Sequence, residues 1–582
     1  MNEATSGSGP IETTSRGADA MTSERQIDLL VLGSGAAGMT AALTGAVLGL
    51  DVLLVEKTDV VGGTSARSAG SLWVPNSRHS PPGSDSPENA WRYLRGVLGN
   101  RLDETRVGAF LAAAPEMVAF MEDNTAVALR AYAHHPDYRA TLEGATLSGR
   151  VLEPVPFDAS VLGSDFAKLR PPLPEFMLLG GMMVDRTDIG HLLNARRSFA
   201  SLRHGVGLVA RYGTDRLRFA RGTRLVMGNA LVGRLYYSLL QRRVPILLST
   251  QTLSLTQSEG RITGALLQSA GTRIALRSRG VVLATGGFSH NAEMRRRLLP
   301  PAVCAHSPVA EGAQGDGIAL AEQAGGCLSI GDGNGFWSPV SLRHRRDDSL
   351  AVFPHLVLDR GKPGLIAVDS LGRRFVSEAV DYHRFAEAML LASSPGQPCF
   401  LICDDAFIAK YGLGMVRPRR INLRRALADG YLRQAHTLEA LAQAIGVPAE
   451  ALAHTVARHN GFARTGVDED FGKGSDAYQQ NLGGPLHRPN RCIGPIDKPP
   501  FYALAVYASD LGTSCGLRTN AFGQVLRADA SPISGLYACG NDMASIMAGA
   551  YPGPGITIGP GMTFGFIAAR HAAAQLGKSG AI

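Results

Sequence analysis

The stretch that decides the fold runs from residue 27 to residue 56 and reads IDLLVLGSGAAGMTAALTGAVLGLDVLLVE. Residues 27–32 form a short apolar run, which predicts a buried strand. A glycine-rich turn follows at 33–38, then a helix of small residues over 39–48 and a second strand over 51–55 that ends on Glu56. A strand, a glycine turn, a helix, a strand and an acid in this order predict a dinucleotide-binding unit.

Each glycine of the turn has a distinct purpose in such a unit. Gly33 permits the tight turn, Gly35 lets a pyrophosphate approach the backbone, and Gly38 lets the helix pack closely on the strand. The helix N-terminus supplies N–H groups and a positive dipole end to the pyrophosphate. Glu56 is expected to accept hydrogen bonds from a ribose, and its charge disfavours a 2′-phosphate.

Later segments suit a cofactor longer than NAD. They are Gly62-Gly63-Thr64-Ser65 with Ser68 and Gly70, the stretch VVLATGG at 281–287, and GLYACGND at 535–542. Taken with the first unit, they resemble the FAD-binding segments of the fumarate reductase/succinate dehydrogenase flavoprotein superfamily, over about residues 27–575. The resemblance implies FAD, bound by Gly33, Gly35, Ala36, Ala37, Gly38, Glu56, Lys57, Gly63, Thr64, Ser65, Ser68, Gly70, Ala284, Thr285, Gly286, Gly540 and Asn541.

The predicted fold is α/β, with a discontinuous Rossmann-like FAD-binding domain and an inserted α+β substrate or cap domain. The two parts of the FAD-binding domain are placed at 27–304 and 495–582, and the cap domain at 305–494, which ends in a linker rich in proline and glycine. Residues 1–26 are rich in Ser, Thr, Gly and acids and are predicted to be a disordered tail.

Composition limits the chemistry and the partners. The seven cysteines are odd in number and match no disulfide, metal, haem or iron–sulfur spacing, so a reducing, cytoplasmic location and no metal site are expected. Redox chemistry then needs an organic cofactor and an external electron acceptor, a quinone or a similar molecule.

The net charge of +8 comes largely from arginine, with eight arginines between Arg196 and Arg224. No nucleic-acid motif accompanies them, so a solvated basic face is favoured over nucleic-acid binding. Apolar residues lie among these arginines at a rough helical spacing, which leaves peripheral membrane contact open as an alternative. They are Leu192, Leu193, Phe199, Leu202, Val206 and Val209.

The turn Tyr551-Pro552-Gly553-Pro554-Gly555 directly precedes a predicted helix over 557–575. The prolines have no N–H, so the available donors belong to the two glycines, at a helix N-terminus. A phenol beside a bare amide could hold a carbonyl oxygen as negative charge develops on it. The alternative is a proline and glycine turn that only starts the helix.

This turn resembles the Tyr-Pro-Gly-x-Gly motif of the 3-ketosteroid Δ1-dehydrogenases. The resemblance implies that the hydroxyl of Tyr551 and the N–H of Gly555 bind the 3-keto oxygen of the substrate. Residues 548–555 contain no arginine, which disfavours the dicarboxylate reduction of the fumarate reductases. Residues 372–382 resemble the segment of the proton-abstracting base, which implies Tyr382, although Ser377 and Asp381 replace the usual Asn and Pro.

Residues 134–138 and 149–154 resemble the stretch that bears the assisting tyrosine. This implies Tyr138, with Tyr132 as a competing candidate. The implied activity is 1,2-desaturation of a small hydrophobic ketone, a 3-ketosteroid, with a proton passing to Tyr382 and a hydride to flavin N5. The alternatives are a desaturase of another cyclic ketone such as 4-oxocyclohexane carboxylate, a fumarate-reductase-like enoate reductase, and a flavin-binding redox or interaction protein without a substrate.

Overall fold

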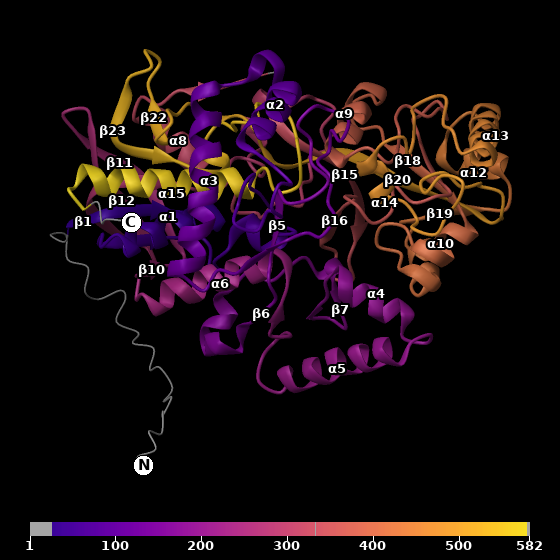
Figure 1. Ribbon diagram of the computed structural model, residues 1–582, viewed down its shortest axis with the longest axis horizontal. Helices are drawn as coiled ribbons and strands as arrows, with labels where there is room; N and C mark the ends of the chain where they lie inside the picture. The colour runs from indigo at the N-terminus through magenta and orange to yellow at the C-terminus, as the bar shows by residue number, and fades with distance from the viewer. Residues whose placement is uncertain (1–25, 332, 579–582) are drawn as a thin grey trace.

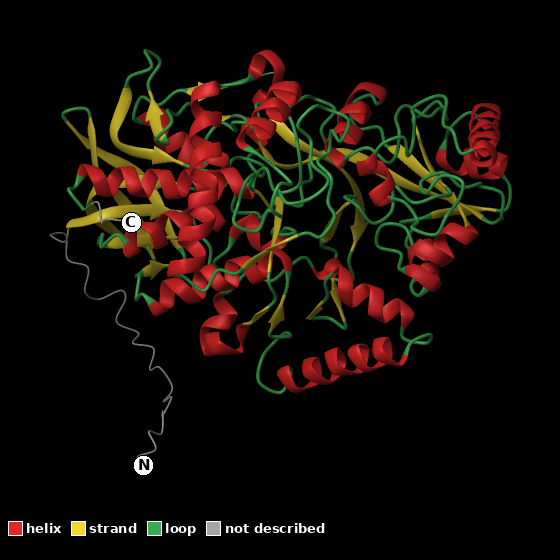
Figure 2. Cartoon of the chain, in the orientation of Figure 1, coloured by secondary structure: helices red, strands yellow, loops and turns green. Residues whose placement is uncertain are grey.

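Two large β-sheets organise the chain in the computed structural model, which describes residues 26–331 and 333–578 (Figures 1 and 2). The first sheet lies near both ends of the described chain, and the second lies at the opposite end of the molecule. The predicted disordered tail falls outside the described residues, except for Gln26, which begins the first strand.

The first sheet has the strand order β10-β2-β1-β13-β12-β11, and β23 pairs with β13 and β22. The pairs that β1 makes with β2 and β13 are parallel, as is the pair of β13 with β23. The carboxyl ends of these strands are level, because Leu32 pairs with Val55 and Leu283, and Leu283 pairs with Ala538. The strands are β1 (Gln26–Leu32), β2 (Val52–Val55), β10 (Ile246–Leu247), β11 (Thr250–Ser258), β12 (Arg261–Ser269), β13 (Thr272–Leu283), β22 (Gln524–Leu526) and β23 (Pro532–Ala538).

This alignment brings three glycine-rich loops to one edge of the sheet, although their sequence positions are far apart. Ligands of parallel α/β sheets bind at this edge, outside the carboxyl ends of the strands. Helix α1 (Ala36–Val47) begins there, three residues earlier than expected, since the turn residues Ala36 to Gly38 are already helical. Helix α15 (Ile558–Gln575) packs on α1 so closely that a Cβ atom on Gly565 would lie 2.5 Å from the carbonyl oxygen of Ala37.

The second sheet is antiparallel, with the order β16-β15-β20-β18-β17, and β19 pairs with β20. Its strands are β15 (Gly335–His344), β16 (Leu350–Pro354), β17 (Leu365–Val368), β18 (Cys399–Asp404), β19 (Arg433–Ala435) and β20 (Phe501–Thr513). Helices around it include α9 (Tyr382–Ala392), α10 (Asp405–Tyr411), α12 (Leu438–Ile445), α13 (Ala449–Thr465) and α14 (Ala477–Leu482). The mixed α/β fold is thus confirmed, whereas the domain boundaries at 304 and 494 stay a prediction.

Candidate active site

The glycines of the first turn form a cradle for a ligand. A Cβ atom on Gly33 would lie 2.2 Å from the carbonyl oxygen of Ala284, and one on Gly38 would lie 2.0 Å from that of Gly33, so both are needed for close backbone packing. A Cβ atom on Gly35 would meet only the hydroxyl of Ser65, at 3.7 Å. The backbone of Gly35 therefore faces space that no protein atom fills, as a bound pyrophosphate requires.

The N-terminus of α1 is also left open for an anion. Its N-cap residue is Gly35, which has no side chain to cap the helix, and no acidic residue stands in its first turn. The N–H of Ala36 donates to Ser65 Oγ at 3.1 Å, which brings the second loop against the first. A phosphate is stabilised at such an end by the free N–H groups and the helix dipole, so these residues fit the pyrophosphate of FAD.

Glu56 lies at the end of β2, beside the turn. Its carboxylate accepts hydrogen bonds from the N–H and Oγ of Ser34, at 3.0 and 2.6 Å, and from the N–H and Oγ1 of Thr58, both at 2.9 Å. Two of these donors are hydroxyls that can rotate away, and the same carboxylate oxygens can then accept from a ribose. The neighbouring Lys57 forms an ion pair with Asp316, at the start of α8 (Asp316–Gln323).

The other predicted cofactor residues line the same edge. Thr64 Oγ1 accepts from the N–H of Ala310 at 3.1 Å, and Ser68 Oγ accepts from the N–H of Gly70 at 3.0 Å. A Cβ atom on Gly286 would meet only Ala313, at 3.9 Å, so this backbone also faces open space. The turn at 540–542 lies against α1: Gly540 is next to Ala37, and Asn541 is next to Gly287.

Asp542 is a structural residue of this edge that the sequence prediction missed. Its buried carboxylate accepts from the N–H of Thr285 at 2.5 Å and from the N–H of Gly287 at 2.9 Å. It also accepts from the hydroxyl of Thr285, which in turn accepts from the N–H of Gly317 at 3.0 Å. Asp542 therefore joins the loop after β13 to the turn after β23. Its place directly after Gly540 and Asn541 is the sequence signal that could have identified it.

The Tyr551–Gly555 turn lies directly before α15. Gly555 has a φ of +91°, and a Cβ atom on it would lie 2.5 Å from the carbonyl oxygen of Ser71, so only glycine fits this position. Its carbonyl accepts from the N–H groups of Trp73 and Gly559, at 3.2 and 2.8 Å. Within the described part of the chain, no protein oxygen accepts from the N–H of Gly555, which leaves this donor for a ligand.

Three predicted tyrosines meet beside this turn. The ring centroid of Tyr551 lies 5.1 Å from that of Tyr382 and 5.7 Å from that of Tyr138, and the Tyr138 and Tyr382 rings are 5.8 Å apart. All three are buried. Tyr132 instead lies half-buried with its ring 5.4 Å from His135, so Tyr138 is the tyrosine that joins the cluster.

Tyr478 is a fourth member that the sequence prediction missed. Its ring lies 4.7 Å from that of Tyr138, and its buried hydroxyl has no hydrogen-bond partner in the described protein. It comes from α14, nearly 100 residues after Tyr382, and no local motif marks it.

A backbone hydrogen bond holds Tyr138 against the turn, and Tyr93 binds the same carbonyl group. Its N–H donates to the carbonyl oxygen of Pro552 at 2.9 Å, and the hydroxyl of Tyr93 donates to the same oxygen at 2.5 Å. The preceding residue, Asp137, is fully buried and pairs with the buried Arg150 at 2.8 Å. Asp137 also accepts from the indole N–H of Trp73 at 2.9 Å.

Tyr382 is the first residue of α9, and the residues before it are held firmly. Asp381 caps the helix by accepting from the N–H of Arg384 at 3.0 Å, which explains how an acid can replace the usual proline. The buried Arg360 donates to the carbonyl oxygens of Glu378 and Val380, at 3.0 and 3.1 Å. Arg360 thus satisfies the backbone carbonyl groups of this loop.

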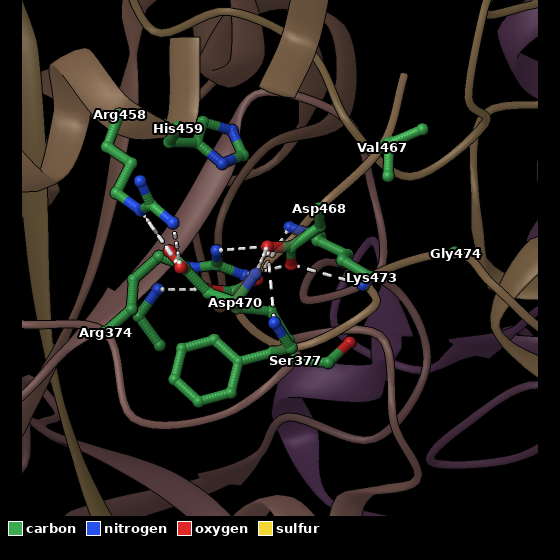
Figure 3. Close-up of polar contacts among 12 residues, drawn as sticks. Arg374, Ser377, Arg458, His459, Val467, Asp468, Asp470, Lys473 and Gly474 are labelled. Carbon is green, nitrogen blue, oxygen red and sulfur yellow. Dashed lines mark hydrogen bonds and ion pairs between the residues drawn. The ribbon is translucent and has the colours of Figure 1, made fainter. Parts of the chain in front are cut away.

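A buried charge network supports the same segment, and Figure 3 shows the part of it around Arg374, Asp468 and Lys473. The carboxylate of Glu378 pairs with Arg374 at 2.8 Å and with Lys473 at 3.0 Å. Asp468 pairs with Arg374 at 2.8 Å and accepts from the backbone N–H groups of Asp470 and Lys473, both at 3.1 Å. The network joins the segment before Tyr382 to the loop that leads to α14, and so to Tyr478.

Burial keeps the tyrosine hydroxyls protonated. Burial raises the pKa of Tyr551 to about 12, opposed by interactions of its hydroxyl with Tyr382 and Thr557. The pKa of Tyr382 is raised well above its usual value, by burial first and then by the charge of Tyr551, while Tyr138 acts in the opposite direction. Tyr551 is therefore a hydrogen-bond donor near neutral pH, and the hydroxyl of Tyr382 is protonated there too.

Comparison with known proteins gives matches over nearly the full chain. A family model described as FAD binding domain matches residues 28–558. A 3-oxosteroid 1-dehydrogenase of Mycobacterium tuberculosis is 36% identical over 572 residues, which are 95% of this chain and 99% of the relative. A 4-oxocyclohex-2-ene-1-carboxylate 5-dehydrogenase of Sinomonas cyclohexanicum is 36% identical over 552 residues, 94% of this chain and 93% of the relative.

A solved structure agrees with the curated relatives. The crystal structure of 3-ketosteroid delta1-dehydrogenase from Sterolibacterium denitrificans, in complex with 1,4-androstadiene-3,17-dione, matches with a TM-score of 0.87 and 37% identity. The match covers 94% of this chain and 100% of that one. With the glycine cradle and the open N-terminus of α1, these matches establish FAD as the cofactor. The chain belongs to the FAD-dependent oxidoreductases that act on CH–CH groups, in the family of the 3-oxosteroid 1-dehydrogenases.

Proposed function

We propose that this protein removes hydrogen from C1 and C2 of a 3-ketosteroid. The observation that carries the proposal is the meeting of Tyr138, Tyr382 and Tyr551 beside the unpaired N–H of Gly555. A steroid relative at 36% identity and the steroid-bound structure at 37% identity support the choice of substrate.

In the proposed reaction the hydroxyl of Tyr551 and the N–H of Gly555 donate hydrogen bonds to the 3-keto oxygen. These bonds strengthen as negative charge develops on that oxygen, and this makes the C2 proton acidic. Tyr382 takes the C2 proton, and Tyr138 assists through its hydroxyl. When FAD is bound, it would supply the acceptor for the hydride that leaves C1. Loss of one proton and one hydride leaves a C1=C2 double bond conjugated with the ketone.

Tyr551→Phe tests this proposal. The change removes one of two donors to the developing enolate oxygen, so the rate of flavin reduction by androst-4-ene-3,17-dione should fall about 100-fold or more. Wild-type and variant protein are mixed anaerobically with the steroid, and flavin bleaching is followed. Tyr132→Phe is the matched control, since Tyr132 lies outside the cluster, and it should keep the wild-type rate within about threefold. A wild-type rate in Tyr551→Phe would contradict the assignment.

A second candidate substrate is a smaller cyclic ketone that bears a carboxylate. The Sinomonas relative, which acts on a 4-oxocyclohexene carboxylate, has the same 36% identity as the steroid relative. The same donors and base would serve that ketone. Anaerobic bleaching by 4-oxocyclohexane carboxylate and not by the steroids would decide for this candidate. The electron acceptor that reoxidises the flavin, a quinone or a similar molecule, stays a prediction.

A further inference from the structure

Helices α4 (Arg186–Asn194) and α5 (Phe199–Asp215) form a projection from the body of the protein, and α5 lies apart from both sheets at the lower margin of Figure 1. The inner face of α5 is small and polar. Its buried residues are Ser201 and Gly205, and Ser201 Oγ lies 3.1 Å from His191 Nδ1 of α4. The hydroxyl of Tyr212 donates to the carbonyl oxygen of Leu179 at 2.8 Å.

The outer face of α5 is apolar, which reverses the usual arrangement of a surface helix. Phe199 is 81% exposed, Leu202 47%, Val206 59% and Val209 46%. Their spacing of three and four residues places them on one side of the helix, and we call them the α5 stripe. Isolated exposed apolar residues are normal on a protein surface, whereas a contiguous stripe marks a contact surface.

Unpaired positive charge lies before, within and after the stripe along the chain. The arginines involved are Arg196, Arg197, Arg203, Arg216 and Arg218. None of these five has a carboxylate within ion-pair distance in the part of the chain that the structure describes. The nearby acids are already engaged, as Asp188 shows by pairing with Arg224 and His204, both at 2.8 Å. This segment therefore exposes apolar side chains together with unpaired positive charge.

We propose that the α5 stripe and its arginines dock on the surface of an anionic lipid bilayer. Helices of this kind lie in the interface, with apolar side chains among the acyl chains and basic side chains on the lipid phosphates. The contact is peripheral, because no helix in the described residues is long and apolar enough to cross a bilayer. A second copy of the chain is a poorer occupant, since dimerisation would bring ten unpaired arginines together.

Helix α4, which precedes the proposed surface in the chain, begins near the candidate active site. Burial lowers the pKa of His135 and the pKa of Lys362. The charge of Arg186, the first residue of α4, lies close enough to lower both pKa values further. The ring of His135 lies 6.5 Å from that of Tyr138. The bilayer contact does not rest on the reaction proposed above, but it would place the site next to a source of apolar substrates.

Sedimentation with vesicles tests the docking. Flavin-loaded protein is mixed with phosphatidylcholine vesicles that contain about one third phosphatidylglycerol, and with pure phosphatidylcholine vesicles. The test variant carries L202S, V206S and V209S together. The control carries L391S and L486S, which remove two leucines that are 91% and 93% exposed elsewhere. Wild type and control should bind the anionic vesicles, and the test variant should bind at least about tenfold more weakly.

A second variant tests the role of the arginines, and two further measurements check that each variant is folded. R196Q, R197Q and R203Q together should weaken binding to the anionic vesicles and reduce its dependence on salt. The flavin absorption spectrum and thermal unfolding check that each variant is folded, without any assay of turnover. Equal vesicle binding by wild type and the stripe variant, or no binding by wild type, would overturn the proposal. A dimer that the stripe variant abolishes, without vesicle binding, would overturn it in favour of contact between copies.

Discussion

At the scale of single residues, Gly555 has a backbone conformation that only glycine adopts without strain, and it also presents an unpaired N–H. Its φ of +91° is strained for any residue with a side chain, and the space where a Cβ atom would lie is taken by the backbone of Ser71. At the same time its N–H is free to bind the substrate oxygen. The shape of the turn and its proposed chemistry therefore depend on the same atom positions.

Gly555→Ala should lower both activity and stability. A Cβ atom 2.5 Å from the Ser71 carbonyl oxygen forces the turn to move, so we expect flavin reduction to slow by about 100-fold or more. We expect the free energy of unfolding to fall by about 2 kcal/mol. Urea titration and anaerobic stopped-flow measure the two effects.

Gly446→Ala is the matched control. Gly446 also has a positive φ, +74°, but a Cβ atom on it would meet nothing within 4 Å. The control should lose about 1 kcal/mol of stability through backbone strain alone and keep its activity. Equal activity in the two variants would show that the N–H position of Gly555 does not matter for the reaction.

The pKa of Tyr382 predicts how the reaction depends on pH. Because this pKa is raised above 10, the phenolate fraction increases as pH rises from 7 to 9. The anaerobic rate of flavin reduction should rise over this range, with a slope of up to about one log unit per pH unit. The residual rate of Tyr382→Phe should be flat. A wild-type rate that is constant from pH 7 to 9 would exclude Tyr382 as the base.

At the scale of elements, the start of α9 is positioned by charges that are themselves buried. Glu378, Arg374, Lys473 and Asp468 are almost inaccessible to solvent, and they link the segment before Tyr382 to the loop before α14. Breaking a buried network of this kind is costly, because the remaining charges lose their partners inside the protein. We expect the network to set the position of Tyr382 relative to Tyr478 and Tyr138.

Glu378→Gln should therefore destabilise the protein by about 3 kcal/mol, measured by urea unfolding. Burial raises the pKa of Glu378, but the charges of Arg374 and Lys473 outweigh this effect and lower it well below 4.5. The stabilisation is thus complete above about pH 4.5 and is lost as pH falls through the folded-state pKa. The wild-type advantage over Glu378→Gln should shrink in acid.

A surface ion pair provides the comparison for Glu378. Glu116 pairs with Arg570 at 2.7 Å, with side chains 62% and 40% exposed. Glu116→Gln should cost less than about 1 kcal/mol, because water screens the exposed pair. If the two Gln variants lost equal stability, the buried network would not have the role we give it.

At the scale of the whole molecule, the candidate site draws on elements from many parts of the chain. The first sheet places the cofactor loops after β1, β13 and β23 at one edge. Tyr138 lies in a loop of the long chain segment that connects β2 to β10. Tyr382 comes from a helix beside the second sheet, and Tyr551 comes from the turn before α15. The candidate site thus combines residues from both parts of the fold.

The sequence by itself determined the features that local chemistry decides. The order of strand, glycine turn, helix and acid at 27–56 predicts the dinucleotide unit, because only glycine permits those turns and approaches. The motif at 551–555 predicts a helix start with bare donors, because its two prolines have no N–H and only the glycines can donate. The cofactor, the fold class and the family followed from these local patterns.

Only the tertiary structure decided which distant side chains meet. It brings Tyr138 and not Tyr132 to Tyr382 and Tyr551, and it adds Tyr478, which no local motif marks. It also shows that Asp542 holds Thr285 and Gly287, which lie more than 250 residues earlier in the chain. It also shows that the apolar side of α5 faces outward, a point that helical spacing alone leaves open. Periodicity shows which residues share a face, but which face is covered depends on how the rest of the chain packs.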